Sequence, residues 1–206
     1  MNHREIEAKF FISDPGKLLL KLNEVSALLT VPRVHEMNYR FDSSDHRLSA
    51  AGEVLRLRSD TRIRMTYKGA SDPNSAVADR EELEVELSDL DTARMILEQL
   101  GFQIMVVYEK YRTTWQLEDA EIVFDELPMG NFCEIEAKDS AAIERLTRML
   151  DMDWDKRVTI SYLAIFQQLK SKHQLKMDQL TFHDFSQVVI HQNMFSEIGI
   201  IPADAG

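Results

Sequence analysis

Apolar and charged residues alternate with a period of two along most of the first two thirds of the chain, and turn-forming residues separate the alternating runs. Such alternation is typical of β-strands, because successive side chains point to opposite faces. About eight strands are predicted, at residues 4–12, 34–42, 53–60, 62–69, 80–88 and 102–117, with two more within 118–138 around a Pro/Gly turn. Short turns join most neighbours, so we expect the strands to be antiparallel.

Segments with a helical period interrupt and follow the strands, and they carry apolar stripes typical of amphipathic helices. They lie at residues 14–29, 89–101, 139–152 and 157–180. The first of them has Asp14 as its expected N-cap and Pro15 at its first position. Residues 181–206 are ambiguous between a helix and irregular chain, and we expect their end to be a disordered tail.

Strand parity places nearly all charged residues of each strand on one face and the apolar residues on the other. In the first strand Glu5, Glu7 and Lys9 share a face. The charged faces carry almost only Glu, Arg and Lys; the first and last strands are acid-rich, whereas the strands at 55–68 and 110–112 are basic. A sheet with one solvent-exposed face explains simple alternation of apolar and polar residues. The segregation of carboxylates and guanidinium groups on different strands instead favours a site that binds a metal and a polyanion together.

Closing the strands into a barrel leaves two arrangements of these faces. With the apolar faces inward, the protein is an ordinary packed barrel with a charged surface. With the charged faces inward, the lumen is a charged tunnel, and amphipathic helices must cover the apolar outside. The second arrangement is unfavourable unless each charge is paired or meets a ligand, a cost that proteins accept at functional sites.

The composition indicates the class of protein, the partners it excludes and the expected location. The 206 residues are 44% hydrophobic and 29% charged, which is typical of a globular chain with a sizeable core. The net charge of −11 argues against binding of nucleic acid through bulk charge. A single cysteine, an N-terminus too charged for a signal peptide and the lack of a long apolar run favour a cytoplasmic protein without a membrane span.

Several short motifs follow one another along the chain: the Glu-x-Glu-x-Lys start, then LRLR, TYKG, REELEVEL, EKYR, FDELPMGNFCEIE and a late SY. In this order they resemble the CYTH superfamily, the triphosphate tunnel metalloenzymes, which include class IV adenylyl cyclases and thiamine triphosphatases. The resemblance covers roughly residues 4–165. It implies an α+β fold, a closed eight-stranded antiparallel barrel with a charged lumen and helices packed on its outside. We expect this tunnel domain at residues 1–165 and a C-terminal helical extension with a tail at 166–206.

The resemblance also implies a role for each charged residue that matches a motif of the family. The expected metal ligands are Glu5, Glu7, Asp125, Glu134 and Glu136. The metal would be Mg²⁺ or Mn²⁺, which prefer oxygen ligands. The expected phosphate-binding residues are Arg56, Arg58, Lys68, Lys110 and Arg112. Lys9 matches a lumenal lysine of the family, and a carboxylate, Glu82 or Glu84, is expected to orient the attacking water.

The function implied is metal-dependent hydrolysis of inorganic triphosphate, or of a triphosphate on a small organic group, with water attacking a terminal phosphorus. Such phosphoryl transfer needs mainly positioning and charge neutralisation. Two alternatives stay open: a class IV adenylyl cyclase that makes cyclic AMP and pyrophosphate from ATP, and a non-catalytic module that binds polyphosphate or nucleotides. The expected partner is the small-molecule triphosphate; no nucleic acid or membrane is expected, and a homodimer is plausible.

Some charged residues have no role from the resemblance. Lumenal positions and structural ion pairs are equally open for Arg62, Arg64, Arg80 and Glu86. Lys138 ends a second EIEAK segment, and both a lumenal and a surface position are open for it. At Arg40 the sequence departs from the family, in which relatives often have an aromatic residue.

Overall fold

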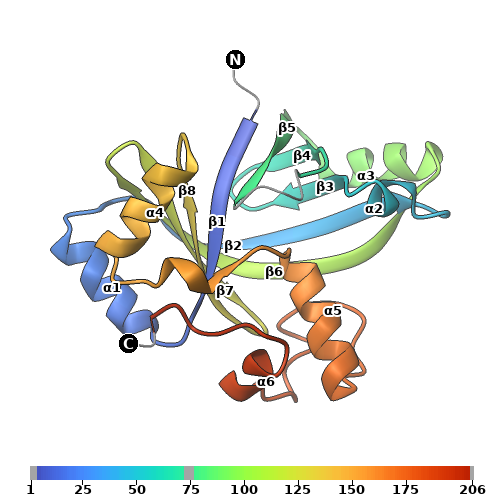
Figure 1. Cartoon of the computed structure of the whole chain (residues 1–206). Coiled ribbons are helices and arrows are strands. Elements are labelled where there is room, and N and C mark those ends of the chain that lie inside the picture. Colours follow the sequence, from blue (N-terminus) through green and yellow to red (C-terminus); the bar gives the residue numbers. More distant parts are fainter. Residues whose placement is uncertain (1–3, 72–76, 205–206) are drawn as a thin grey trace.

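The structure is a computed structural model, and it describes residues 4–71 and 77–204, with side chains from residue 6 onward. Among these residues, eight antiparallel strands form a hydrogen-bonded ring in the order β5-β4-β3-β2-β6-β7-β8-β1, and β1 pairs again with β5. Their bounds are β1 Arg4–Ile12, β2 Leu28–Ser43, β3 Val54–Ser59, β4 Ile63–Lys68, β5 Ala78–Leu87, β6 Phe102–Leu117, β7 Ala120–Leu127 and β8 Gly130–Glu136. The short β9 (Arg157–Val158) pairs with β1 beside the ring. The expected α+β barrel is therefore confirmed (Figure 1).

The helices of the described residues are α1 Pro15–Glu24, α2 Arg47–Ala50, α3 Leu90–Gln99, α4 Ser140–Met149, α5 Tyr162–His173 and α6 Gln192–Ser196, with a 3-10 turn, η1, at Trp154–Lys156. The longer helices α1, α3, α4 and α5 each begin after an Asp or Ser whose side chain accepts a backbone N–H three residues on. That contact satisfies one of the free donors of the first turn. No helix in the described ranges is long and apolar enough to cross a membrane.

The helix predicted at 14–29 is wrong in its last turn. α1 ends at Glu24, Ser26 has a left-handed backbone conformation with φ of 57°, and β2 already begins at Leu28. Leu28 and Leu29 pair with the end of β6. The apolar run continues the helical spacing, but strand pairing with a distant segment overrides this local pattern.

The helix predicted at 157–180 is correct only in its middle. β9 occupies its first two residues, and α5 ends at His173, since the next residue, Gln174, has a left-handed conformation with φ of 54°. Leu180 instead lies beside β6, where its N–H donates to the carbonyl of Val107 and its carbonyl accepts from Glu109. Contacts with a remote strand, which no local period encodes, therefore fix this segment.

The apolar faces of the strands point outward, and helices cover them on opposite sides of the barrel (Figure 1). α1 and α4 pack on the outside of β1, β7 and β8, where Phe10, Ile135 and Ile143 are buried. α3 places Leu97 against Leu57 on the outside of β3. The charged faces therefore point into the lumen, which is the second of the two arrangements that the pattern allowed.

Aromatic residues of β1, β8, α5 and α6 pack together at one end of the lumen, and α5 and α6 lie at the bottom in Figure 1. Phe11 and Phe132 are register partners on the lumenal face of β1 and β8. Phe195 of α6 stacks on Phe11 with ring centroids 4.1 Å apart, and Tyr162 of α5 meets Phe132 edge-on at 5.0 Å. We call these four residues the aromatic floor; with it in place, the lumen is a cavity closed at this end.

The end of the described chain is fixed against the start of α1. The buried carboxylate of Asp204 accepts hydrogen bonds from the backbone N–H and hydroxyl of Ser13 and from the backbone N–H of Asp14. Lys17 donates to the backbone carbonyl of Asp204 at 2.9 Å. The segment expected as an extension therefore wraps beneath the barrel, and its expected boundary at 165/166 lies within α5.

Candidate functional site

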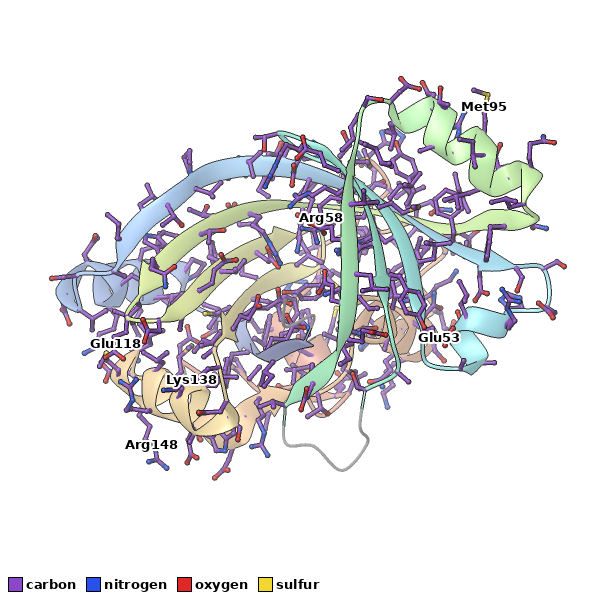
Figure 2. The ribbon with its side chains drawn as sticks, turned by 90° about the horizontal axis from the view of Figure 1, so that it is seen from above. Glu53, Arg58, Met95, Glu118, Lys138 and Arg148 are labelled. Atoms are coloured by element: carbon purple, nitrogen blue, oxygen red, sulfur yellow. The ribbon has the colours of Figure 1, made fainter. Side chains whose placement is uncertain are left out.

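The lumen holds a cavity of about 690 Å³. Most residues predicted for the site line it: Glu7, Lys9, Arg56, Arg58, Lys68, Glu82, Glu84, Lys110, Arg112, Glu134 and Glu136. Figure 2 looks onto the ring from above, with Arg58 on its inner side. The side chain of Glu5 lies outside the described part of the chain, although its backbone pairs with Arg80 of β5.

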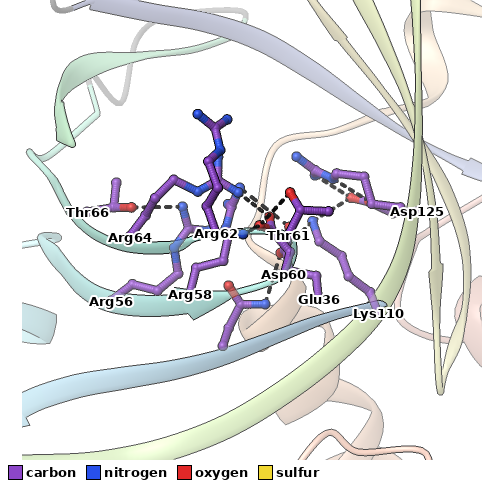
Figure 3. Close-up of polar contacts among 12 residues, drawn as sticks. Glu36, Arg56, Arg58, Asp60, Thr61, Arg62, Arg64, Thr66, Lys110 and Asp125 are labelled. Carbon is purple, nitrogen blue, oxygen red and sulfur yellow. Dashed lines mark hydrogen bonds and ion pairs between the residues drawn. The ribbon is translucent and has the colours of Figure 1, made fainter. Parts of the chain in front are cut away.

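Asp125 of β7 is fully buried and is not among the lining residues. Lys110 donates to its carboxylate at 2.8 Å, Arg112 makes a two-point contact at 2.7 and 2.6 Å, and the hydroxyl of Tyr162 donates at 3.0 Å. Arg112 also donates to Glu134 at 2.6 Å. Figure 3 draws the contact of Lys110 with Asp125. Charge-assisted hydrogen bonds of this kind fix the orientation of the donor side chains, so Asp125 orients Lys110 and Arg112, which face the cavity.

Lys9 lies next to this network on β1. Its ammonium is 3.2 Å from Glu134, its register partner on β8, and 4.4 Å from the centre of the Tyr162 ring. Burial lowers the pKa of Lys9, but Glu134 and Glu7 outweigh it and raise that pKa above its ordinary value. Burial likewise raises the pKa of Glu134, and Lys9 and Arg112 bring it well below its ordinary value. Both groups are therefore charged at neutral pH.

The opposite side of the lumen is basic, and we use the term basic side for Arg40, Arg56, Arg58, Arg64 and Lys68 of β2, β3 and β4. Within the described part of the chain, the guanidinium of Arg56 donates only to hydroxyls, those of Tyr108 at 3.4 Å and Thr66 at 3.3 Å. The Nε atoms of Arg56 and Arg58 are buried without a hydrogen-bond partner among the described residues. Burial and the nearby charge of Arg56 lower the pKa of Arg58 from its ordinary value.

The carboxylate of Glu36 is shared between Arg58 of the basic side and Lys110 of β6. It is buried on β2, 3.4 Å from Arg58 and 3.5 Å from Lys110. Burial raises the pKa of Glu36, but Lys110 and Arg58 lower it well below its ordinary value. Arg58 therefore shares its carboxylate with Lys110, and Arg56 forms no ion pair within the described residues, so this part of the basic side carries positive charge in excess, which favours an anion in the cavity.

The rim of the basic side carries the two carboxylates expected to orient water. Glu82 is 2.8 Å from Lys68. Glu84 accepts from the hydroxyl of Thr66 at 2.9 Å and lies 3.6 Å from Arg64. Both therefore face the basic groups that a phosphate would contact.

Three carboxylates from adjacent strands lie side by side at the other edge of the cavity. Glu7 of β1 is the register partner of Glu136 of β8, which is in turn the partner of Glu121 of β7. We call these three residues the acidic row; all of them line the cavity. Directly opposed like charges are unfavourable, so this row suits a divalent cation. Within the described residues no three acidic, His or Cys side chains converge enough to hold an ion by themselves.

The structure also places the residues that the sequence left open. Arg64 and Arg80 line the cavity, whereas Arg62 and Glu86 form an exposed ion pair at 3.5 Å. Lys138 is exposed and lies beside α4, outside the ring (Figure 2).

Sequence reasoning assigned no site role to five residues of the site: Glu36, Arg40, Tyr108, Glu121 and Tyr162. Strand parity on 34–42 places Glu36 and Arg40 on one face, so that signal was present for two of them. Tyr108 likewise shares a strand face with Lys110. Tyr162 belongs to the late SY motif, but it enters from a helix, so only the tertiary fold shows that it reaches the cavity.

An antiparallel barrel that encloses a cavity lined by opposed acidic and basic side chains defines a tunnel-type protein. The chain belongs to the CYTH family, since the model of the CYTH domain matches residues 3–151. The motif order that resembled this family is thereby confirmed as a family signature.

Individual relatives agree with this assignment. A Methanocaldococcus jannaschii protein named "Putative adenylate cyclase" is 28% identical over 172 residues, which are 78% of this chain and 97% of that protein. A solved structure from Pyrococcus horikoshii is 26% identical with a TM-score of 0.65, covering 79% of this chain and 98% of that one. A Hippeastrum protein, described as a "putative adenylyl cyclase" with a dominant triphosphatase activity, has a TM-score of 0.59 at 16% identity, covering 79% of this chain and 95% of that one.

Proposed function

We propose that this protein is a metal-dependent triphosphatase that hydrolyses inorganic triphosphate or a small organic triphosphate in its lumen. The division of one cavity into a basic side and an acidic row carries this proposal. The guanidinium groups of Arg56 and Arg58 have few anionic partners of their own. A polyanion bound there would supply them, since guanidinium groups bind phosphate oxygens in two-point contacts.

The acidic row fits a divalent metal by the chemistry of its donors. Mg²⁺ is usually held by one or two carboxylates together with substrate phosphates rather than by a complete protein cage. Glu7 and Glu136 would hold it, together with the expected Glu5. When bound, Mg²⁺ or Mn²⁺ would neutralise charge on the phosphate oxygens.

The remaining residues bind, orient and move protons in this proposal. The basic groups Arg56, Arg58, Lys68, Lys110 and Arg112 would hold the phosphate chain. Lys9, held by Glu134, would contact a phosphate oxygen next to the scissile bond. Glu82 or Glu84 would orient the water that attacks the terminal phosphorus and accept its proton. The bond from that phosphorus to the bridging oxygen breaks, and its electron pair leaves on that oxygen with the rest of the phosphate chain.

Asp125 has a different place in this scheme from that of the other expected metal ligands. Its carboxylate already accepts from Lys110, Arg112 and Tyr162. We therefore propose that it positions these cations, and metal binding by Asp125 stays a prediction. Glu134 is likewise paired with Lys9 and Arg112, so we propose that it positions these cations, and metal binding by Glu134 also stays a prediction.

The relatives support two activities. The Hippeastrum protein is described with a dominant triphosphatase activity, which agrees with the proposal. The Methanocaldococcus jannaschii relative is named as a cyclase, so formation of cyclic AMP is the second candidate.

One assay separates the candidates. The protein is incubated with tripolyphosphate, ATP and thiamine triphosphate under Mg²⁺ and under Mn²⁺, and phosphate, pyrophosphate and cyclic AMP are measured. Metal-dependent release of phosphate supports the proposal. Pyrophosphate together with cyclic AMP identifies a cyclase, and tight binding without any product identifies a binding module.

The metal assignment has its own test in the double variant Glu5→Gln and Glu7→Gln. We expect metal-dependent turnover to disappear in it. The control is Glu98→Gln, which removes an exposed carboxylate of α3 far from the cavity. If turnover survives in the double variant, the assignment of the first strand to the metal is wrong.

A further inference from the structure

Arg40 of β2 lines the cavity beside the basic residues that the family motifs identify. It is the register partner of Arg56 on β3, so two guanidinium groups lie directly opposite each other on one face. Like charges in that arrangement are unfavourable. The only hydrogen bond described for Arg40 runs from its Nη2 to the backbone carbonyl of Glu53 at 3.1 Å. Most of the five donors of the guanidinium group remain available.

No carboxylate of the described residues forms an ion pair with Arg40. Asp42, two residues along the same face, is occupied by the backbone N–H groups of Leu48 and Ser49. Burial lowers the pKa of Arg40 from its ordinary value; Tyr108 and Asp42 act in the opposite direction, and the charges of Arg80 and Arg56 lower it further. A half-buried guanidinium among other cations is stable in a folded protein mainly when an anion comes to it.

The basic groups extend farther along the lumen than three phosphates require. Arg112 lies next to Asp125 near the aromatic floor, whereas Arg40 pairs with Val106 of β6. From Val106 to Arg112 is six residues along β6, roughly 20 Å at about 3.3 Å per residue. A chain of three phosphates is shorter than this distance. The Arg40 end of the basic side can therefore contact an anion that lies beyond a triphosphate held near Lys110 and Arg112.

We propose that Arg40, next to Arg56 at the end of the basic side, forms an additional anion subsite, and that it selects substrates with a fourth phosphate over those that carry an uncharged organic group there. This inference rests on the proposed function for the use of the lumen as a phosphate site. An organic group in the same place would leave the guanidinium of Arg40 buried without a counter-charge. A linear inorganic polyphosphate of four or more units supplies that charge.

The test measures binding rather than turnover, so that it gives a result even if the protein does not hydrolyse triphosphate. The full chain is titrated calorimetrically with tripolyphosphate and with tetrapolyphosphate in EDTA, which removes the metal needed for the proposed hydrolysis. We expect the wild type to prefer tetrapolyphosphate. In Arg40→Met the affinity for tetrapolyphosphate should fall about tenfold or more, the effect of one charge-assisted contact, and that for tripolyphosphate by less than about threefold.

Two further variants make the result specific. Arg62→Met removes an exposed arginine of the β3–β4 hairpin that pairs with Glu86, and it corrects for the loss of one positive charge at a distance. Arg40→Lys keeps the charge without the planar fork and should retain part of the preference. An equal fall for both anions in Arg40→Met, an effect of the same size in Arg62→Met, or a wild type without preference would overturn the proposal.

Discussion

The hydroxyl of Tyr162 donates a hydrogen bond to the fully buried carboxylate of Asp125 at 3.0 Å. Tyr162 is the first residue of α5, and Asp125 belongs to β7. The contact therefore joins the helix that closes one end of the lumen to the carboxylate that orients Lys110 and Arg112. The closing helix and the phosphate-binding cations are parts of one network.

This network predicts that substitution of Asp125 destabilises the protein far more than substitution of Tyr162. Asp125→Asn leaves Lys110 and Arg112 buried without their main counter-charge, so we expect stability to fall by about 3–5 kcal/mol. Tyr162→Phe removes one hydrogen bond and keeps the ring, so we expect a loss of about 1 kcal/mol. Urea unfolding of both variants measures these values.

Comparison of Asp125→Asn with Glu7→Gln tests whether Asp125 binds the metal. If it positions cations, the affinity for Mn²⁺ in Asp125→Asn should stay close to that of the wild type, whereas Glu7→Gln should weaken it. A loss of Mn²⁺ affinity in Asp125→Asn as large as that in Glu7→Gln would make Asp125 a metal ligand. Folding of each variant is checked first by circular dichroism.

The burial of Cys133 predicts that its thiol does not react with thiol reagents in the native protein. It is the only cysteine of the chain, it has no exposed surface, and it lies in the apolar core between the barrel and its helices. Burial raises the pKa of the Cys133 thiol, and the charges of Glu134 and Asp125 raise it further. The thiolate is the reactive form, so a thiol reagent should label the protein only after unfolding in guanidinium chloride. Labelling of the native protein at the rate of a free thiol would contradict this placement.

The barrel could be predicted from the sequence because strand parity is a local property. Alternation along 4–12 and 102–117 already separates a lumenal from an outer face, and the structure keeps that separation. The depth at which a residue lies along the barrel axis is not a local property of the sequence. Parity places Asp125 on the lumenal face, but the aromatic floor, which comes from segments far along the chain, decides that it is buried beneath the cavity.

The C-terminal part could not be predicted for the same physical reason. Leu180 lies against β6 through backbone hydrogen bonds, and Phe195 stacks on Phe11. Neither contact leaves a periodic signal in the residues around it. The helical spacing between 157 and 180 therefore predicts one helix, although tertiary contacts divide this segment.

The acidic row predicts opposite effects of one substitution on stability and on metal binding. Glu136 directly faces Glu7 and Glu121 across its strand. Glu136→Gln removes repulsion, so we expect the metal-free protein to gain a few tenths of a kcal/mol. The rise in melting temperature on addition of Mn²⁺ should become smaller, because a ligand that binds only the folded state stabilises it in proportion to its affinity.

The comparison for this variant is Glu98→Gln on the exposed face of α3. It should change neither the metal-free melting temperature nor the shift with Mn²⁺. A Glu136→Gln protein with an unchanged Mn²⁺ shift would mean that the acidic row does not hold the metal.

The contact of Asp204 with the start of α1 predicts a stability that depends on pH. Burial raises the pKa of Asp204, but hydrogen bonds from Ser13 and Asp14 outweigh it and leave the pKa below its ordinary value. A carboxyl group with a lowered folded-state pKa stabilises the fold above its unfolded pKa of about 3.9. That contribution disappears as the pH falls toward the folded-state value.

Asp204→Asn should therefore cost about 2 kcal/mol at pH 7, the value of charge-assisted hydrogen bonds to backbone N–H groups. The difference from the wild type should shrink as the pH falls below about 4, because protonation gives the wild type the same neutral group. Unfolding curves at several pH values measure this difference. The matched control is Asp178→Asn, whose carboxylate is exposed and paired with Lys170 in the same C-terminal part. A difference for Asp204→Asn that stays constant between pH 7 and pH 3 would show that the charge of this carboxylate does not hold the C-terminal segment against α1.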